Sequence, residues 1–132
     1  MITSRRVRYG IILFYMLLIF IGSSIPNVTL PKTRFIGTDK IVHVIEYGLF
    51  GSILAFALLP NRKKLVKASH YLTVIGIGWV YAVTDEIHQH FVPNRTMSIY
   101  DFSADAIGIL LGLAFYLLFM RYIYPRIKKR AE

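Results

Sequence analysis

Acidic side chains and histidines gather in one stretch of this 132-residue sequence, residues 84–105, which lies between two strongly apolar segments. The stretch contains four of the seven acidic residues, two of the four histidines and a single arginine: Asp85, Glu86, His88, His90, Arg95, Asp101 and Asp105. Carboxylates and imidazoles transfer protons or bind cations, and a guanidinium binds anions. Because ionisable groups between apolar segments are costly and need partners, we expect the function to reside here.

Asp85 and Glu86 give the sharpest functional signal. We expect both near the C-terminal end of a helix, where the helix dipole opposes negative charge. Burial raises the cost further, so a cation, a proton or a metal must offset them. The candidate partners on the same side are Lys40, His43 and Arg95. A purely structural buried network is the alternative interpretation.

The same stretch limits the metal chemistry. Asp85-Glu86-x-x-Gln89 is similar to a zinc-binding His-Glu-x-x-His helix, but Asp and Gln stand where the histidines would be, so a zinc site of that type is not expected. An oxygen-rich site for Mg²⁺, Mn²⁺ or Ca²⁺, completed by His43, stays chemically open. The sequence requires no cofactor, and the absence of cysteine excludes thiolate metal sites.

Four apolar segments would position these side chains. We expect helices at about residues 9–25, 40–59, 70–91 and 101–124, in a single domain covering residues 1–132. Hydrophobic residues make up 55% of the chain, the mean hydropathy is +0.52, and the apolar parts lack the polar stripe of a soluble bundle. The first segment is also similar to a signal peptide, but three further apolar segments favour a retained helix. The sequence therefore predicts an all-α membrane protein with four antiparallel transmembrane helices.

The basic residues indicate the orientation of these helices. The N-terminus, the loop at about 61–69 and the C-terminus hold 12 of the 16 Lys and Arg residues. By the positive-inside rule, both termini are cytoplasmic, and the polar ends of the second, third and fourth helices meet at the outer face. The basic cluster at 126–130 suits anionic lipids of the cytoplasmic face. The net charge of +9 thus fits a membrane protein, and nucleic-acid binding is not expected.

Helical spacing groups the polar residues further, because residues four apart share one face of a helix. The resulting pairs are Asp39 with His43, Asp85 with Gln89, and Asp101 with Asp105. Glu46 and Tyr47 continue the first pair. Ser98-x-x-Asp101 fits a capping box at the start of the fourth helix. Gly108 and Gly112 would let another helix approach closely, in the same chain or in a homo-oligomer.

Together these residues resemble the VanZ-like family of small bacterial membrane proteins. The matching elements are Asp39-Lys40-x-x-His43-x-x-x-Tyr47, Asp85-Glu86-x-x-Gln89 with Pro93-x-Arg95, and Ser98-x-x-Asp101-x-x-x-Asp105-x-x-Gly108. Many members carry Gly at the position of Asn94, and often Asn at that of Asp105. The resemblance implies an integral membrane protein with a role in the cell envelope. Through the founding member of the family, it also implies a link to teicoplanin susceptibility.

Three functions are open for this polar site. In the first, an outward-facing pocket binds an envelope ligand, such as a lipid or a cell-wall precursor, and alters glycopeptide susceptibility. Its ligand-binding residues would be Asp39, Lys40, His43, Tyr47, Gln89, Arg95, Ser98, Asp101 and Asp105. The second is a membrane enzyme for a lipid-linked or phospholipid-headgroup substrate, with Asp85 or Glu86 as general base and His43 as acid or metal ligand. The third is a proton- or ion-coupled transporter, which the apolar inner halves of the helices disfavour.

Overall fold

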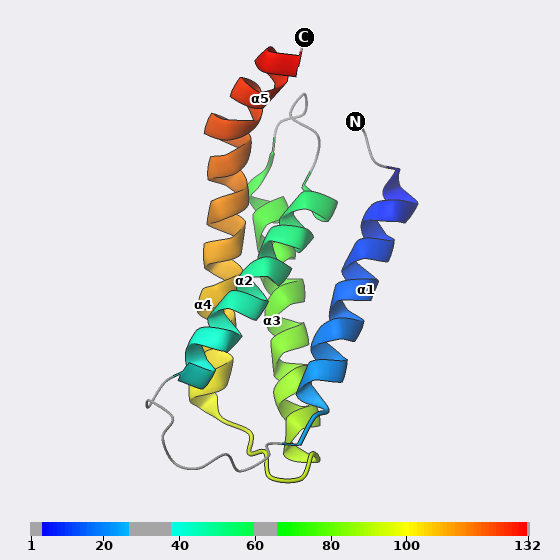
Figure 1. Ribbon diagram of the computed structural model, residues 1–132, viewed down its shortest axis with the longest axis vertical. Coiled ribbons are helices and arrows are strands. Elements are labelled where there is room, and N and C mark those ends of the chain that lie inside the picture. Colours follow the sequence, from blue (N-terminus) through cyan, green and yellow to red (C-terminus); the bar gives the residue numbers. More distant parts are fainter. Residues whose placement is uncertain (1–3, 27–37, 60–65, 132) are drawn as a thin grey trace.

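The computed structural model describes residues 4–26, 38–59 and 66–131, and all regular secondary structure in these ranges is helical. Its elements are α1 (Arg5–Ser23), α2 (Thr38–Leu58), α3 (Ala68–His90), α4 (Ile99–Leu118), the π-helix η1 (Phe119–Ile123) and α5 (Tyr124–Ala131). The long helices run side by side, and the start of α1 lies at the same end as α5 (Figure 1). The all-α prediction is thus confirmed for the described part of the chain. Most of the loops expected at 27–38 and 61–69, and the basic side chains at 128–130, lie outside it.

Three described helices are long and apolar enough to cross a membrane, by length and composition: Arg5–Ser23, Asp39–Leu58 and Ile99–Ile127. Helix α3 has 23 residues, but its last turns carry the polar residues 84–90 and interrupt its apolar run. The fold is therefore that of a helical protein suited to a membrane. The fourth span and the orientation of the helices stay predictions.

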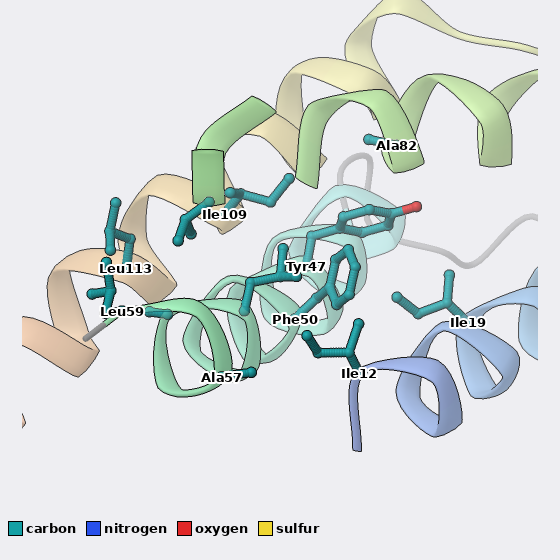
Figure 2. Close-up of a cluster of buried hydrophobic side chains, with 12 residues drawn as sticks. Ile12, Ile19, Tyr47, Phe50, Ala57, Leu59, Ala82, Ile109 and Leu113 are labelled. Carbon is teal, nitrogen blue, oxygen red and sulfur yellow. The ribbon is translucent and has the colours of Figure 1, made fainter. Parts of the chain in front are cut away.

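Helix α2 supplies the centre of the apolar core. Tyr47 and Phe50 are fully buried, and their rings meet edge to face with centroids 6.1 Å apart. Figure 2 shows Ile12 and Ile19 of α1 on one side of these rings and Ile109 of α4 on another. The polar residues in the first half of α2 lie next to the C-terminal part of α3 and the start of α4.

Glycines bring α2 and α4 into backbone contact, and α2 packs more extensively against α4 than against any other described helix. A Cβ atom added at Gly51 would lie 2.5 Å from the carbonyl oxygen of Ile109, and one added at Gly112 would overlap the carbonyl oxygen of Gly48. A Cβ at Gly108 would lie 3.0 Å from the backbone nitrogen of Gly48. The expected close approach at Gly108 and Gly112 is therefore confirmed, with α2 of the same chain as the partner. An oligomer through these glycines stays a prediction, and it would have to displace α2.

The helical rod at the C-terminal end continues past Pro125, where the sequence led us to expect a helix end. Helix α4 passes into η1, and α5 begins at Tyr124. Proline lacks an N–H group, and its ring clashes with the carbonyl four residues earlier in a regular helix. The π-helical turn widens the backbone immediately before Pro125, and the first turn of a helix tolerates proline. The helical structure therefore extends to Ala131.

The glycine contact leads to a stability prediction. We expect Gly112→Ala to lower the free energy of unfolding by about 1–3 kcal/mol, because the added methyl group forces α2 and α4 apart. Thermal unfolding of the purified protein in detergent, followed by circular dichroism, measures this change. The matched control is Gly76→Ala in α3, where the added Cβ meets nothing within 4 Å. Equal effects of the two substitutions would contradict the close contact of α2 with α4.

Candidate functional site

One face of α2 carries three polar side chains, Lys40, His43 and Tyr47, spaced by three and four residues. The contact of α2 with α4 brings the first two of them against the start of α4. Lys40 Nζ donates to the carboxylate of Asp101, and His43 Nδ1 lies 2.8 Å from Asp105 Oδ1. Two cross-helix pairs therefore join α2 to α4, because Lys40 and His43, three residues apart, and Asp101 and Asp105, four residues apart, each share one helix face.

Asp39 lies at the rim of this arrangement. Its side chain is 53% exposed, and its Oδ2 accepts from Lys40 Nζ at 3.0 Å. The sequence indicated that Asp39 and His43 share one helix face. The two side chains do not pair, because His43 contacts the buried carboxylate of Asp105 instead. Lys40 thus bridges two carboxylates, one at the rim and one on α4.

Asp85 belongs to a hydrogen-bonded chain that runs from the loop into the core. Its side chain is 5% exposed, and its Oδ2 accepts from the Tyr47 hydroxyl at 3.1 Å and from Gln89 Nε2 at 2.8 Å. Gln89 Oε1 in turn accepts from Arg95 Nη1 at 3.1 Å. The expected pairing of Asp85 with Gln89 is therefore confirmed. Arg95 connects to Asp85 through Gln89, rather than by the direct pairing that the sequence indicated.

Arg95 also links the C-terminal end of α1 to the loop between α3 and α4. Its Nε donates to the carbonyl of Ile25 at 3.1 Å and its Nη2 to the carbonyl of Gly22 at 3.4 Å. Carbonyls at a helix C-terminus lack partners within the helix, and the dipole there favours a cation. A further contact joins the C-terminal ends of α1 and α3, where Ser24 Oγ lies 2.9 Å from His88 Nε2. The sequence did not reveal this role of Arg95, since no pattern indicates which backbone carbonyls a side chain will reach.

Glu86 lies beside the start of α4 and is 3% exposed. Its Oε2 accepts from the backbone N–H of Ser98 at 2.9 Å. In the predicted capping box, Asp101 would have taken this amide. Ser98 does cap α4, accepting from the amide of Tyr100 at 3.2 Å, but the Asp101 carboxylate turns to the Lys40 ammonium, a charged partner that gives the stronger hydrogen bond. The predicted capping box is therefore correct for Ser98 and wrong for Asp101.

Three buried carboxylates each keep an oxygen with no hydrogen-bond partner among the described residues: Asp85 Oδ1, Glu86 Oε1 and Asp105 Oδ2. In the described ranges, the lysine and arginine ion pairs are those of Lys40 with Asp39 and Asp101. A buried carboxylate without a charged partner costs several kcal/mol. The cation that Asp85 and Glu86 were expected to need is not found in this part of the chain, so the cluster retains the capacity to bind a cation or protons.

Glu46 also belongs to this end of the bundle, although the sequence did not place it among the site residues. Its side chain is half-buried on α2, and a Cβ built at Gly22 would lie 3.8 Å from its Oε1. The Tyr15 hydroxyl donates to its backbone carbonyl at 3.0 Å. The three-residue spacing from His43 was the available signal. Glu46 therefore adds a further acidic group where α1 meets α2.

A metal ion or a proton relay fits this geometry. His43, Glu86 and Asp105 come from three different helices, and each offers a ligand atom within 4.8 Å of the other two. An imidazole held by one carboxylate and close to another is also suited to acid–base chemistry. We call these three residues, together with Glu46 and Asp85, the acidic cluster.

A groove on the side of the bundle has a different character. It lies between α1 and α3, and its lining is almost entirely apolar: Met16, Gly76, Ile77, Val80, Tyr81 and Thr84. Thr84 precedes Asp85 in the chain, so the groove extends toward the acidic cluster along α3. Its apolar walls suit an acyl chain.

The described helices and their site define a class: a helical protein suited to a membrane, with acidic side chains of α2, α3 and α4 buried together at one end. The VanZ/LLP1 family model matches residues 3–120. The chain therefore belongs to the VanZ/LLP1 family, and the matched range includes the whole acidic cluster. No curated protein and no solved structure matches the chain.

The chain of hydrogen bonds through Asp85 leads to a second stability prediction. We expect Tyr47→Phe to lower the free energy of unfolding by about 1–3 kcal/mol, because the buried carboxylate of Asp85 loses a hydrogen-bond donor. Thermal unfolding in detergent measures the change. The matched control is Tyr100→Phe, since Tyr100 is 74% exposed and should tolerate the substitution. An unchanged free energy of unfolding for Tyr47→Phe would show that this hydrogen bond does not hold Asp85 in place.

Proposed function

We propose that this chain is a four-span protein of the bacterial cell membrane, with both termini in the cytoplasm and the acidic cluster at the outer face. The basic residues support this orientation, because 12 of 16 lie at the termini or in the loop at 61–69. Helix α3 supplies the fourth span, its polar end lying beside α2 and α4 instead of in lipid. The start of α1 and α5 lie together at one end of the bundle, as the proposal requires (Figure 1).

At the outer face, the protein binds an envelope ligand. The observation that carries this proposal is that α2, α3 and α4 bring their polar side chains together while three buried carboxylate oxygens stay unpaired. A site that served only to hold the helices together would pair these oxygens, since each unpaired one costs stability. Unpaired groups at a shared end are those that a ligand can satisfy.

The rim favours a ligand with an anionic group and an acyl chain. Lys40 has a side chain that is 36% exposed, and it lies between two carboxylates that hold its ammonium in place. Arg95 is the second cation, but three of its nitrogens already donate to the chain. Lys40 donates two of its three ammonium protons to Asp39 and Asp101, so one is left for a phosphate or carboxylate, while the acyl chain would lie against the apolar faces of the helices. A lipid or a lipid-linked cell-wall precursor has both parts, and binding it would alter teicoplanin susceptibility.

This function is tested by the teicoplanin susceptibility of a strain that lacks the gene and expresses either the wild-type protein or a variant. We expect Lys40→Ala and Glu86→Ala to behave like the empty vector, because the first removes the anion contact and the second disturbs the acidic cluster. The matched control is Arg6→Ala, which removes an exposed cation at the opposite end of α1. It should behave like the wild type.

Insertion of each variant is checked with a C-terminal fusion to a protein that fluoresces only in the cytoplasm. Equal fluorescence of all the strains shows that the variants insert with the proposed orientation. Full wild-type behaviour of Lys40→Ala and Glu86→Ala in inserted protein would contradict the proposed site. A dark wild-type fusion would contradict the orientation.

A membrane enzyme is the second candidate, and the 2.8 Å contact of His43 with Asp105 beside Glu86 favours it. In this function, Glu86 acts as the general base on a lipid-linked or headgroup substrate, and His43, oriented by Asp105, acts as the acid. Purified protein incubated with an envelope lipid extract should change the lipid masses, and His43→Gln should abolish the change. An unchanged extract with the wild-type protein would exclude this reaction class for the lipids present.

A further inference from the structure

We propose that His43, Glu86 and Asp105 bind a divalent cation at the polar end of the bundle. The three side chains come from α2, α3 and α4, and their ligand atoms lie within 4.8 Å of one another. Two ligands of one ion lie roughly 3–4.5 Å apart, so small rotations of these side chains close them around an ion. The donor set of one imidazole and two carboxylates is a common type of metal site.

Unpaired buried oxygens point to a cation independently of this spacing. Glu86 is 3% exposed and Asp105 is 0% exposed, and each keeps a fully buried oxygen that has no partner among the described residues. The His43 side chain is 12% exposed, so the site is largely shielded from solvent. These two shielded carboxylates have no lysine or arginine partner in the described ranges, and a divalent cation would compensate their charge.

The other hydrogen bonds of these side chains orient them as in known metal sites. Glu86 is held through Oε2 by the Ser98 amide, which leaves Oε1 unpaired. Asp105 is held through Oδ1 by His43, which leaves Oδ2 unpaired. Ligating carboxylates usually have such a second hydrogen bond, which fixes their orientation. Asp85, which accepts from Tyr47 and Gln89, is a further carboxylate near the site.

The ligand types indicate which ion is preferred. Mg²⁺ and Ca²⁺ favour sites made of oxygen alone, whereas an imidazole suits transition-series ions and Zn²⁺. The mixed set therefore favours Mn²⁺ or Zn²⁺. Three protein ligands leave coordination positions open, as in sites where a metal contacts water or a ligand. A cation here would present a positive centre to the anionic group of an envelope ligand, although its binding does not depend on the proposed function.

Metal binding by the purified full-length protein tests the inference. The protein in detergent is treated with a chelator, dialysed against Mn²⁺ or Zn²⁺ and passed through a desalting column, and the metal per chain is measured by mass spectrometry. We expect about one ion per wild-type chain and at least about tenfold weaker binding by Glu86→Gln and Asp105→Asn. The matched control is His90→Gln, which removes an exposed imidazole at the same end and should bind like the wild type.

A second measurement needs no variant to fold. Adding Mn²⁺ or Zn²⁺ to chelator-treated wild-type protein should raise its Tm, because an ion bound by the folded state alone stabilises it. A wild-type protein that retains no metal and shows no rise in Tm would overturn the inference. It would also be overturned if folded Glu86→Gln and Asp105→Asn kept the metal, or if His90→Gln lost as much metal as they did. No envelope ligand is present in this assay, so its outcome is separate from that of the susceptibility test.

Discussion

The burial of carboxylates among apolar helices is the constraint on which the rest of this structure depends. Asp85, Glu86 and Asp105 lie where water is scarce, and a charge without solvent needs fixed donors or a counterion. The chain supplies donors for one oxygen of each: a tyrosine hydroxyl, a glutamine amide, a backbone N–H and an imidazole. Most of the hydrogen bonds that join α2, α3 and α4 at this end serve one of these three residues.

The contact between α2 and α4 determines how close together these polar groups lie. Glycines allow the two backbones to touch, and the side chains near this contact are therefore held at a fixed distance across the helix pair. Lys40 and His43 then face Asp101 and Asp105 without having to extend or bend. If the helices stood further apart, His43 would not reach Asp105, and the acidic cluster would lose its link to α2. The small residues of the apolar half thus position the polar half.

Sequence patterns predicted the helices and the convergence of their polar ends, since both follow from hydropathy and from the alternation of basic loops. The pairing of Asp85 with Gln89 followed from helical spacing, and the close approach at Gly108 and Gly112 from residue size. Contacts that depend on competition were less accessible. Asp101 could accept from the Ser98 amide of its own helix or from the Lys40 ammonium on α2, and no local pattern determines which bond forms. The roles of Arg95 and Pro125 depend on backbone positions that only the folded chain defines.

The attachment of α1 affects how the chain assembles during synthesis. The described hydrogen bonds that join α1 to later helices use its C-terminal half, through Tyr15, Met16, Gly22, Ser24 and Ile25. Arg95 follows Gly22 by 73 residues, which a ribosome adds in roughly 4–15 s. Within this interval Tyr15 gains its partner on α2 and Met16 its partner on α3, so Arg95 adds the last of these contacts. The first helix to be made is thus secured in stages, to α2 first, then to α3, and at its C-terminal end by Arg95 once the polar loop before α4 has been translated.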